Sequence, residues 1–135
     1  MLLTQVIYTK TQGTKQFAIV DAAMNDLLRP TLYGAYHEVL QVRRTSEVRR
    51  TYDYDIVGPI CETGDFLAKD RALPPLAPGD LLAIIHVGAY GFAMSSNYNG
   101  RLRPAEVLVN GKTTHLIRHR QTYNGLLEGI VSHPS

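Results

Sequence analysis

The sequence is divided into short runs of aliphatic, aromatic and β-branched residues, each followed by glycine, proline or other turn-forming residues. Such runs are typical of β-strands, and the residues between them are typical of turns. Candidate helices are brief, and no internal repeat or low-complexity tract is present. The pattern predicts a mainly β fold, an antiparallel barrel or sandwich with short helices. Seven strands are expected, over residues 2–8, 17–20, 37–42, 51–57, 81–87, 105–109 and 113–117.

Turn residues mark a hairpin near each end of the chain. Gln12-Gly13 separates the first two runs, and Asn110-Gly111 separates the last two. Asn-Gly between two β-prone runs favours a type I′ turn. Residues 43–50 are rich in charge and are expected to form a solvated loop or an edge.

Three short helices are expected. Pro30 suits the first turn of a helix that runs to Tyr33, because proline has no backbone N–H to donate. Residues 89–94 are small and apolar enough for a second helix. Thr122 is placed to cap a third helix that runs to Leu127.

The run over residues 81–87 is almost entirely apolar, which predicts a central strand buried on both faces. His86 lies in this run and is interpreted as a packed core or interface histidine. The five histidines are scattered and there is one cysteine, so no metal site is expected.

Length and composition fit one domain over residues 1–135. Hydrophobic residues make up 44% of the chain and charged residues 19%, which excludes a disordered protein. The single cysteine excludes an intramolecular disulfide and suits a reducing cytosol. No apolar run approaches the ~20 residues of a membrane helix, and no signal peptide is recognisable. We therefore expect a cytoplasmic protein with no membrane partner.

Arginine clusters at residues 43–44, 49–50 and 118–120 lack flanking aromatic residues on which bases could stack. No nucleic-acid partner is therefore expected. Walker, G-x-S-x-G and HExxH motifs are also absent.

The segment Cys61-Glu62-Thr63-Gly64-Asp65 places a thiol beside two carboxylates in a loop that follows an expected strand. One interpretation is a buried small hydrophobe with two solvated acids. The other is a thiol that exchanges a proton with a substrate, next to a carboxylate that binds an ammonium group.

Two further clusters allow both a structural and a functional interpretation. Arg29 and Tyr33 are four residues apart, so a helical turn would place both on one face, where they could hold a carboxylate. The alternative is a surface arginine stacked on a tyrosine. Gly88-Ala89-Tyr90-Gly91 follows the buried strand, and its N–H groups and phenol could face a phosphate. A simple strand-to-helix turn explains it equally.

Several motifs, taken together and in order, resemble those of the diaminopimelate decarboxylases, which belong to a family of pyridoxal phosphate (PLP)-dependent decarboxylases. The resemblance extends from about residue 6 to residue 129. The matching segments are VDAAM at 20–24, RPTLY at 29–33, VGPICETGD at 57–65, GAYG at 88–91, MSSNYN at 94–99 and RPAEVL at 103–108.

The resemblance implies a two-domain subunit, with an N-terminal PLP-binding barrel and a C-terminal β-domain like that of alanine racemase. It implies a homodimer whose active site lies between the barrel of one subunit and the β-domain of its partner. The implied reaction is decarboxylation of meso-2,6-diaminopimelate to L-lysine and carbon dioxide.

Site roles follow from the same resemblance. Cys61 resembles the general acid, which delivers a proton to the substrate carbon after decarboxylation. Arg29 and Tyr33 resemble binders of a substrate carboxylate, and Glu62 of a substrate ammonium. Tyr90 resembles a contact of both cofactor and substrate, while Asp65 is expected to support its loop or to pair across the interface.

The resemblance also has a gap. The barrel, the glycine-rich phosphate loop and the lysine that anchors PLP have no counterpart here, so the chain alone is predicted to be inactive. The chain is therefore interpreted as part of a decarboxylase. Two alternatives stay open: a separate β-domain that acts as an interaction or regulatory module, and a related decarboxylase of another basic amino acid. Glu62 directly after Cys61, with the Arg29 motif, favours diaminopimelate.

Overall fold

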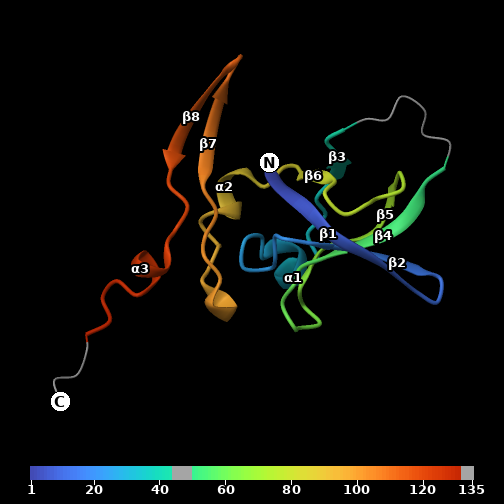
Figure 1. Cartoon of the computed structure of the whole chain (residues 1–135), viewed down its shortest axis with the longest axis horizontal. Coiled ribbons are helices and arrows are strands. Elements are labelled where there is room, and N and C mark those ends of the chain that lie inside the picture. Colours follow the sequence, from blue (N-terminus) through green and yellow to red (C-terminus); the bar gives the residue numbers. More distant parts are fainter. Residues whose placement is uncertain (44–49, 132–135) are drawn as a thin grey trace. The chain divides into compact units, whose positions relative to one another are not determined.

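The computed structural model describes residues 1–43 and 50–131, and at Ala89 the backbone only. The chain forms two compact units, Met1–Ser95 and Ser96–Ser135, which can be followed in Figure 1 by their colours. Most of the expected loop over residues 43–50 lies outside the described residues. The single domain expected over residues 1–135 stays a prediction.

The first unit is a six-stranded sheet that curls into a nearly closed barrel (Figure 1). The strand order is β3-β6-β1-β2-β4-β5, and the two edge strands, β3 and β5, approach each other. Neighbouring strands are antiparallel except β2 and β4, which are parallel. The mainly β barrel is therefore confirmed, with one parallel pair. The strands are β1 (Leu2–Gln12), β2 (Lys15–Val20), β3 (Val39–Gln41), β4 (Tyr52–Val57), β5 (Phe66–Leu73) and β6 (Leu81–Ile84).

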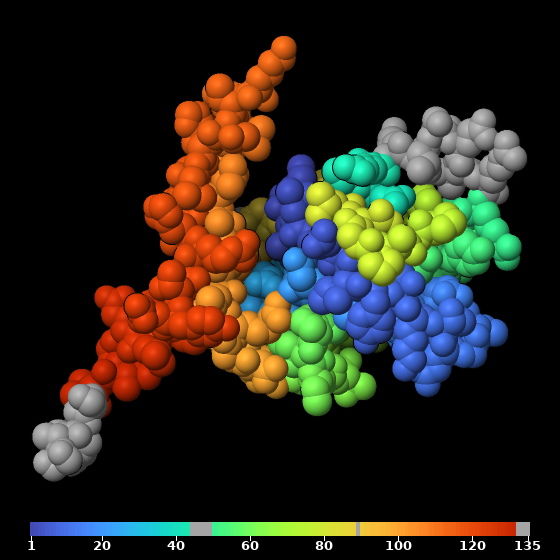
Figure 2. All heavy atoms as spheres, in the orientation of Figure 1, coloured from blue at the N-terminus to red at the C-terminus, as the bar shows by residue number. Residues whose placement is uncertain are grey.

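Apolar side chains that point into the barrel form one core, and their burial is the main force that holds the sheet closed. Figure 2 shows the outer face of the molecule with all heavy atoms as spheres, the atoms of the N-terminal strands in blue. The predicted β1–β2 hairpin is confirmed, with Gly13 at φ 61° in its turn. The buried core consists of Val6, Ala18, Val20, Ala22, Leu27, Val39, Tyr54, Ile56, Leu67, Ala68, Leu73, Leu76, Leu82 and Ile84.

Strand β5 was not expected from the sequence. Lys69, Asp70 and Arg71 interrupt its apolar pattern, and Asp70 adopts a positive φ of 54° where the β4–β5 register shifts. The buried carboxylate of Asp55 accepts a hydrogen bond from the Asp70 N–H at 2.9 Å. The bulge is thus stabilised by a residue from the neighbouring strand.

Strand β6 is shorter than the expected run but is buried on both faces at Leu82, Ala83 and Ile84. His86 lies beyond the end of the strand, is exposed, and has a φ of 59°. Of the two interpretations of His86, the core histidine is therefore wrong, because the strand ends before reaching it, and the interface histidine stays a prediction.

Two short helices of the first unit lie beside the barrel, and both were expected with slightly different bounds. They are α1 (Arg29–Tyr33), which begins with Pro30 in its first turn, and α2 (Gly88–Gly91). Gly34 ends α1 in the left-handed region at φ 63°, and its N–H donates to the Pro30 carbonyl.

Over its described residues, 96–131, the second unit contains the hairpin β7–β8 and two single-turn helices. The hairpin turn residues are Gly111 and Lys112, and only Gly111 has a positive φ. The predicted type I′ turn is wrong, because that turn requires positive φ at both central residues. Thr122 caps its helix as expected, accepting a hydrogen bond from the Gly125 N–H at 3.1 Å. The elements are a 3-10 helix (Tyr98–Gly100), β7 (Glu106–Asn110), β8 (Thr113–Arg118) and α3 (Tyr123–Leu126).

Candidate functional site

The loop that joins β4 to β5 carries Cys61 and Glu62, and we call residues 58–65 the cysteine loop. Asp65 anchors it. One carboxylate oxygen accepts a hydrogen bond from the Met24 N–H and the other from the Ile60 N–H, both at 2.7 Å. Asp65 is only 3% exposed, so these bonds form away from bulk water. The expected supporting role of Asp65 within its loop is confirmed.

The start of the cysteine loop requires glycine. A Cβ atom at Gly58 would lie 2.3 Å from an oxygen of the Asp65 carboxylate, which is too close for any non-bonded contact. The Gly58 N–H donates to the Asp65 carbonyl at 3.0 Å, so the two ends of the loop are joined.

Helix α1 is tied to the cysteine loop by a side chain. The Thr31 hydroxyl donates a hydrogen bond to the Gly64 carbonyl. This bond joins the segment that carries Arg29 and Tyr33 to the segment that carries Cys61 and Glu62, although the two are about thirty residues apart in the sequence.

Cys61 and Glu62 are both exposed near the tip of the loop. The interpretation of Cys61 as a buried small hydrophobe is therefore wrong, because the turn held by Asp65 presents the thiol to solvent. An exposed thiol beside a carboxylate is available to a bound molecule.

Helix α2 meets α1 through an aromatic contact. The guanidinium carbon of Arg29 lies 5.2 Å from the centroid of the Tyr90 ring, within the range of a cation–π interaction. From the sequence, Arg29 was expected to share a helix face with Tyr33. In the structure, the aromatic ring that contacts Arg29 is that of Tyr90, which belongs to α2. Tyr90 and Tyr33 are 59% and 66% exposed, so both phenols remain accessible.

Arg29 retains capacity to bind an anion. Its Nε atom is buried and has no hydrogen-bond partner among the residues that the structure describes. A buried, unsatisfied charged donor is costly and favours an anionic partner. The guanidinium and the Tyr90 phenol therefore fit a carboxylate or phosphate, which is what an acidic substrate or PLP would present.

The sequence missed His37 as part of this region. His37 is 4% exposed, and its Nδ1 lies 3.0 Å from the carbonyl oxygen of Ile85, just before α2. The sequence placed His37 at the start of a strand, and no local signal indicates a bond across 48 residues.

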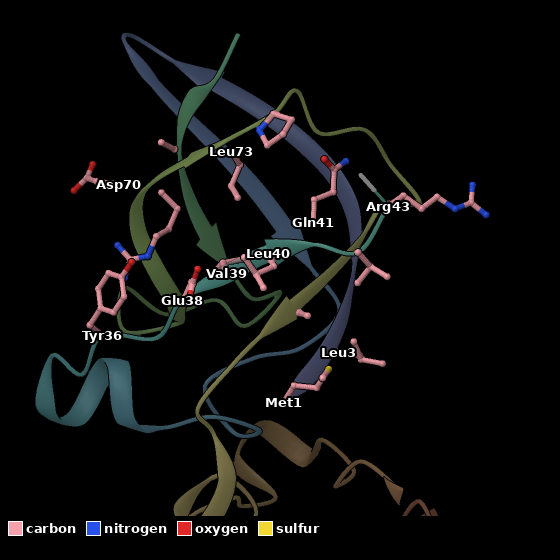
Figure 3. Close-up of a pocket in the computed structure, with 15 residues that line it drawn as sticks. Met1, Leu3, Tyr36, Glu38, Val39, Leu40, Gln41, Arg43, Asp70 and Leu73 are labelled. Carbon is pink, nitrogen blue, oxygen red and sulfur yellow. The ribbon is translucent and has the colours of Figure 1, made fainter. Parts of the chain in front are cut away.

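A separate groove of about 1160 Å³ opens between the edge strands β3 and β5 (Figure 3). Apolar side chains such as Leu3, Leu40 and Leu73 line it, and Arg71 stacks on the Tyr36 ring at 4.0 Å. Its lining contains none of the five predicted site residues. The groove and the candidate site are therefore different features of the first unit.

Two negative findings apply to the described residues only. They contain no group of three or more histidine, cysteine or acidic side chains placed to hold a metal ion. They also contain no helix long and apolar enough to cross a membrane.

Comparison with known proteins matches the chain to one family of decarboxylases. Residues 1–88 match the model of the pyridoxal-dependent decarboxylase, C-terminal sheet domain. Over 130 residues the chain is 62% identical to the diaminopimelate decarboxylase of Pseudomonas aeruginosa, covering 96% of this chain and 30% of that protein. The chain thus spans about three tenths of the length of this relative.

Solved structures agree with the sequence match. The diaminopimelate decarboxylase of M. jannaschii, in co-complex with L-lysine, superposes with a TM-score of 0.89 at 39% identity. That match covers 97% of this chain and 30% of the other. The Helicobacter pylori enzyme, complexed with L-lysine, gives a TM-score of 0.84 at 43% identity, with 93% and 30% covered.

Proposed function

Because this chain belongs to the pyridoxal-dependent decarboxylases as their C-terminal sheet domain, we propose that it supplies part of a diaminopimelate decarboxylase site. The observation that carries the proposal is the physical joining of three motifs. Thr31 bonds to the cysteine loop, and Arg29 stacks on Tyr90. Segments distant in sequence are thereby held in one region that presents a thiol, a guanidinium and phenols.

In this proposal Cys61 is the proton donor. Its thiol is exposed and its loop is held by the buried Asp65, so the group is accessible and its backbone is fixed. It gives its proton to the substrate carbon that has lost carbon dioxide. Glu62, the next residue, binds a substrate ammonium through charge attraction.

Arg29, Tyr33 and Tyr90 bind the acidic groups. The Arg29 guanidinium holds a substrate carboxylate, and the nearby phenols orient it and contact the cofactor. PLP, when bound, supplies the electron sink for decarboxylation. The lysine that anchors it belongs to a barrel outside this chain.

The whole enzyme in this proposal converts meso-2,6-diaminopimelate to L-lysine and carbon dioxide. It is a cytoplasmic homodimer whose site is shared between subunits, and the whole of this chain is its C-terminal β-domain. Support comes from the 62% identity to a diaminopimelate decarboxylase and from the exposure of four of the site residues, Tyr33, Cys61, Glu62 and Tyr90, which leaves them open to a second surface.

The test uses a chimera in which this chain replaces the matching 130 residues of the Pseudomonas aeruginosa relative. We expect carbon dioxide release from meso-diaminopimelate. Cys61→Ala should lower kcat by about 10²-fold or more, because a positioned general acid contributes that much. Thr63→Ser, in the same exposed loop, is the matched control.

Two results would contradict the proposal. One is a Cys61→Ala chimera that releases carbon dioxide with the same kcat as the chimera that retains Cys61. The other is a chimera that prefers ornithine or arginine to diaminopimelate, which would favour the related-decarboxylase alternative.

A further inference from the structure

His37 joins the end of the α1 segment to the start of the α2 segment. Its Nδ1 lies 3.0 Å from the Ile85 carbonyl oxygen. A carbonyl oxygen has no proton to give, so Nδ1 must carry the proton and donate it. The other ring nitrogen, Nε2, is buried with no partner among the described residues.

The hydrogen bond between His37 and Ile85 lies just beyond the last paired residues of strands β3 and β6. The β3–β6 ladder ends at the pair Val39–Ile84. Beyond it, the Ile85 N–H donates to the Glu38 carbonyl at 3.0 Å, and the Ile85 carbonyl accepts from His37. Both the N–H and the carbonyl of Ile85 are thus held by hydrogen bonds, one to Glu38 and the other to His37.

The chain then turns sharply toward α2. His86 takes a φ of 59°, a region that costs energy for any residue other than glycine, and persists only where the surroundings impose it. Tyr90 follows within one helical turn. The hydrogen bonds of Ile85 therefore fix the backbone directly before the strained turn at His86, and this turn sets the position of Tyr90.

The two side-chain contacts and the chain between them form a closed path. Arg29 begins α1, and the chain runs from there to His37, which bonds to Ile85. From Ile85 the chain runs through the turn to Tyr90, whose ring lies under the Arg29 guanidinium at 5.2 Å. Loss of the His37 bond would leave the two segments joined by the bond from the Ile85 N–H to the Glu38 carbonyl, but it would release the Ile85 carbonyl, the group that directly precedes the turn.

We propose that His37 is a positioning residue that sets the geometry of the Arg29–Tyr90 pair by donating from Nδ1 to the Ile85 carbonyl. The contacts described above support the structural role of His37. Its consequence for catalysis rests on the proposed function.

The experiment compares two variants of the full 135-residue chain. In His37→Asn the side-chain amide can donate from a position close to that of Nδ1. In His37→Gln the amide lies further out, close to the position of Nε2. NMR spectra would follow the Gly91 and Met94 amides and the Tyr90 ring, with the β1–β2 hairpin amides as internal control.

We expect a distinct pattern. In the unmodified chain, nitrogen spectra should show His37 as the Nδ1–H tautomer. His37→Asn should keep the Tyr90 signals, whereas His37→Gln should shift them and speed amide exchange at Gly91 and Met94 by about tenfold. The hairpin amides should be unchanged in both variants.

Three outcomes would overturn the inference: an Nε2–H tautomer, identical behaviour of the two variants, or exchange that rises equally in the β1–β2 hairpin. In the chimera, His37→Gln should lower kcat/KM by about tenfold or more, with recovery in His37→Asn. If the chimera is inactive in every form while the NMR pattern holds, the proposed function fails and the positioning role stands.

Discussion

Asp65 holds the cysteine loop through both oxygens of its carboxylate. The two oxygens accept from backbone N–H groups of Met24 and Ile60 on different segments. Hydrogen bonds to a charged acceptor are stronger than neutral ones, and removal of the acceptor leaves buried donors unpaired. A single side chain therefore decides whether the loop that carries Cys61 has one conformation.

Asp65→Ala should destabilise the chain by about 2–4 kcal/mol, because it leaves two backbone donors without their acceptor. Urea unfolding followed by circular dichroism measures the change. Asp53→Ala, at an exposed site on β4, is the matched control and should change stability by less than about 0.5 kcal/mol. Equal stability of the two variants would show that Asp65 does not anchor the loop.

At the scale of elements, one ion-pair cluster joins three strands. The Lys15 ammonium on β2 donates to Asp55 on β4 at 2.9 Å and lies 3.6 Å from Asp70 on β5. The hydrogen bond and charge of Asp55, followed by the charge of Asp70, raise the pKa of Lys15 above its ordinary 10.5. The charged form of Lys15 is therefore favoured by folding.

The sign of the pH dependence follows from this shift. The contribution of Lys15 is fully present below pH 10.5 and is lost as the pH rises through the raised pKa. The unfolding free energies of the chain and of Lys15→Met should differ at about pH 8, and the difference should shrink as the pH rises through the raised pKa of Lys15. The difference should be small, since the ammonium is solvent-exposed. A gap that widens with rising pH would contradict the assignment.

Elements with a clear pattern could be predicted from the sequence, and those fixed by distant partners could not. The β1–β2 hairpin and the Pro30 helix followed from local turn and helix chemistry. Strand β5 was missed because its polar bulge at Asp70 is stabilised by Asp55, fifteen residues away. The Arg29–Tyr90 contact and the His37–Ile85 bond span about 60 and 48 residues, and no local pattern encodes them.

At the scale of the whole molecule, the chain corresponds to one part of a longer relative. It spans about three tenths of the length of the Pseudomonas aeruginosa relative. The second unit, within its described part, has no buried residue, and Val107, Val109 and Leu116 of its hairpin are more than half exposed. A two-stranded hairpin has little stability on its own, so this unit is expected to gain order from further protein.

The most direct test compares the 135-residue chain with its chimera under one assay. Each is supplied with PLP and meso-diaminopimelate, and carbon dioxide release is measured. We expect no release and no covalently bound PLP for the chain alone, and turnover by the chimera that depends on Cys61. Turnover by the chain alone, or a folded PLP-loaded chimera with none, would contradict the claim that these residues supply one part of a decarboxylase site.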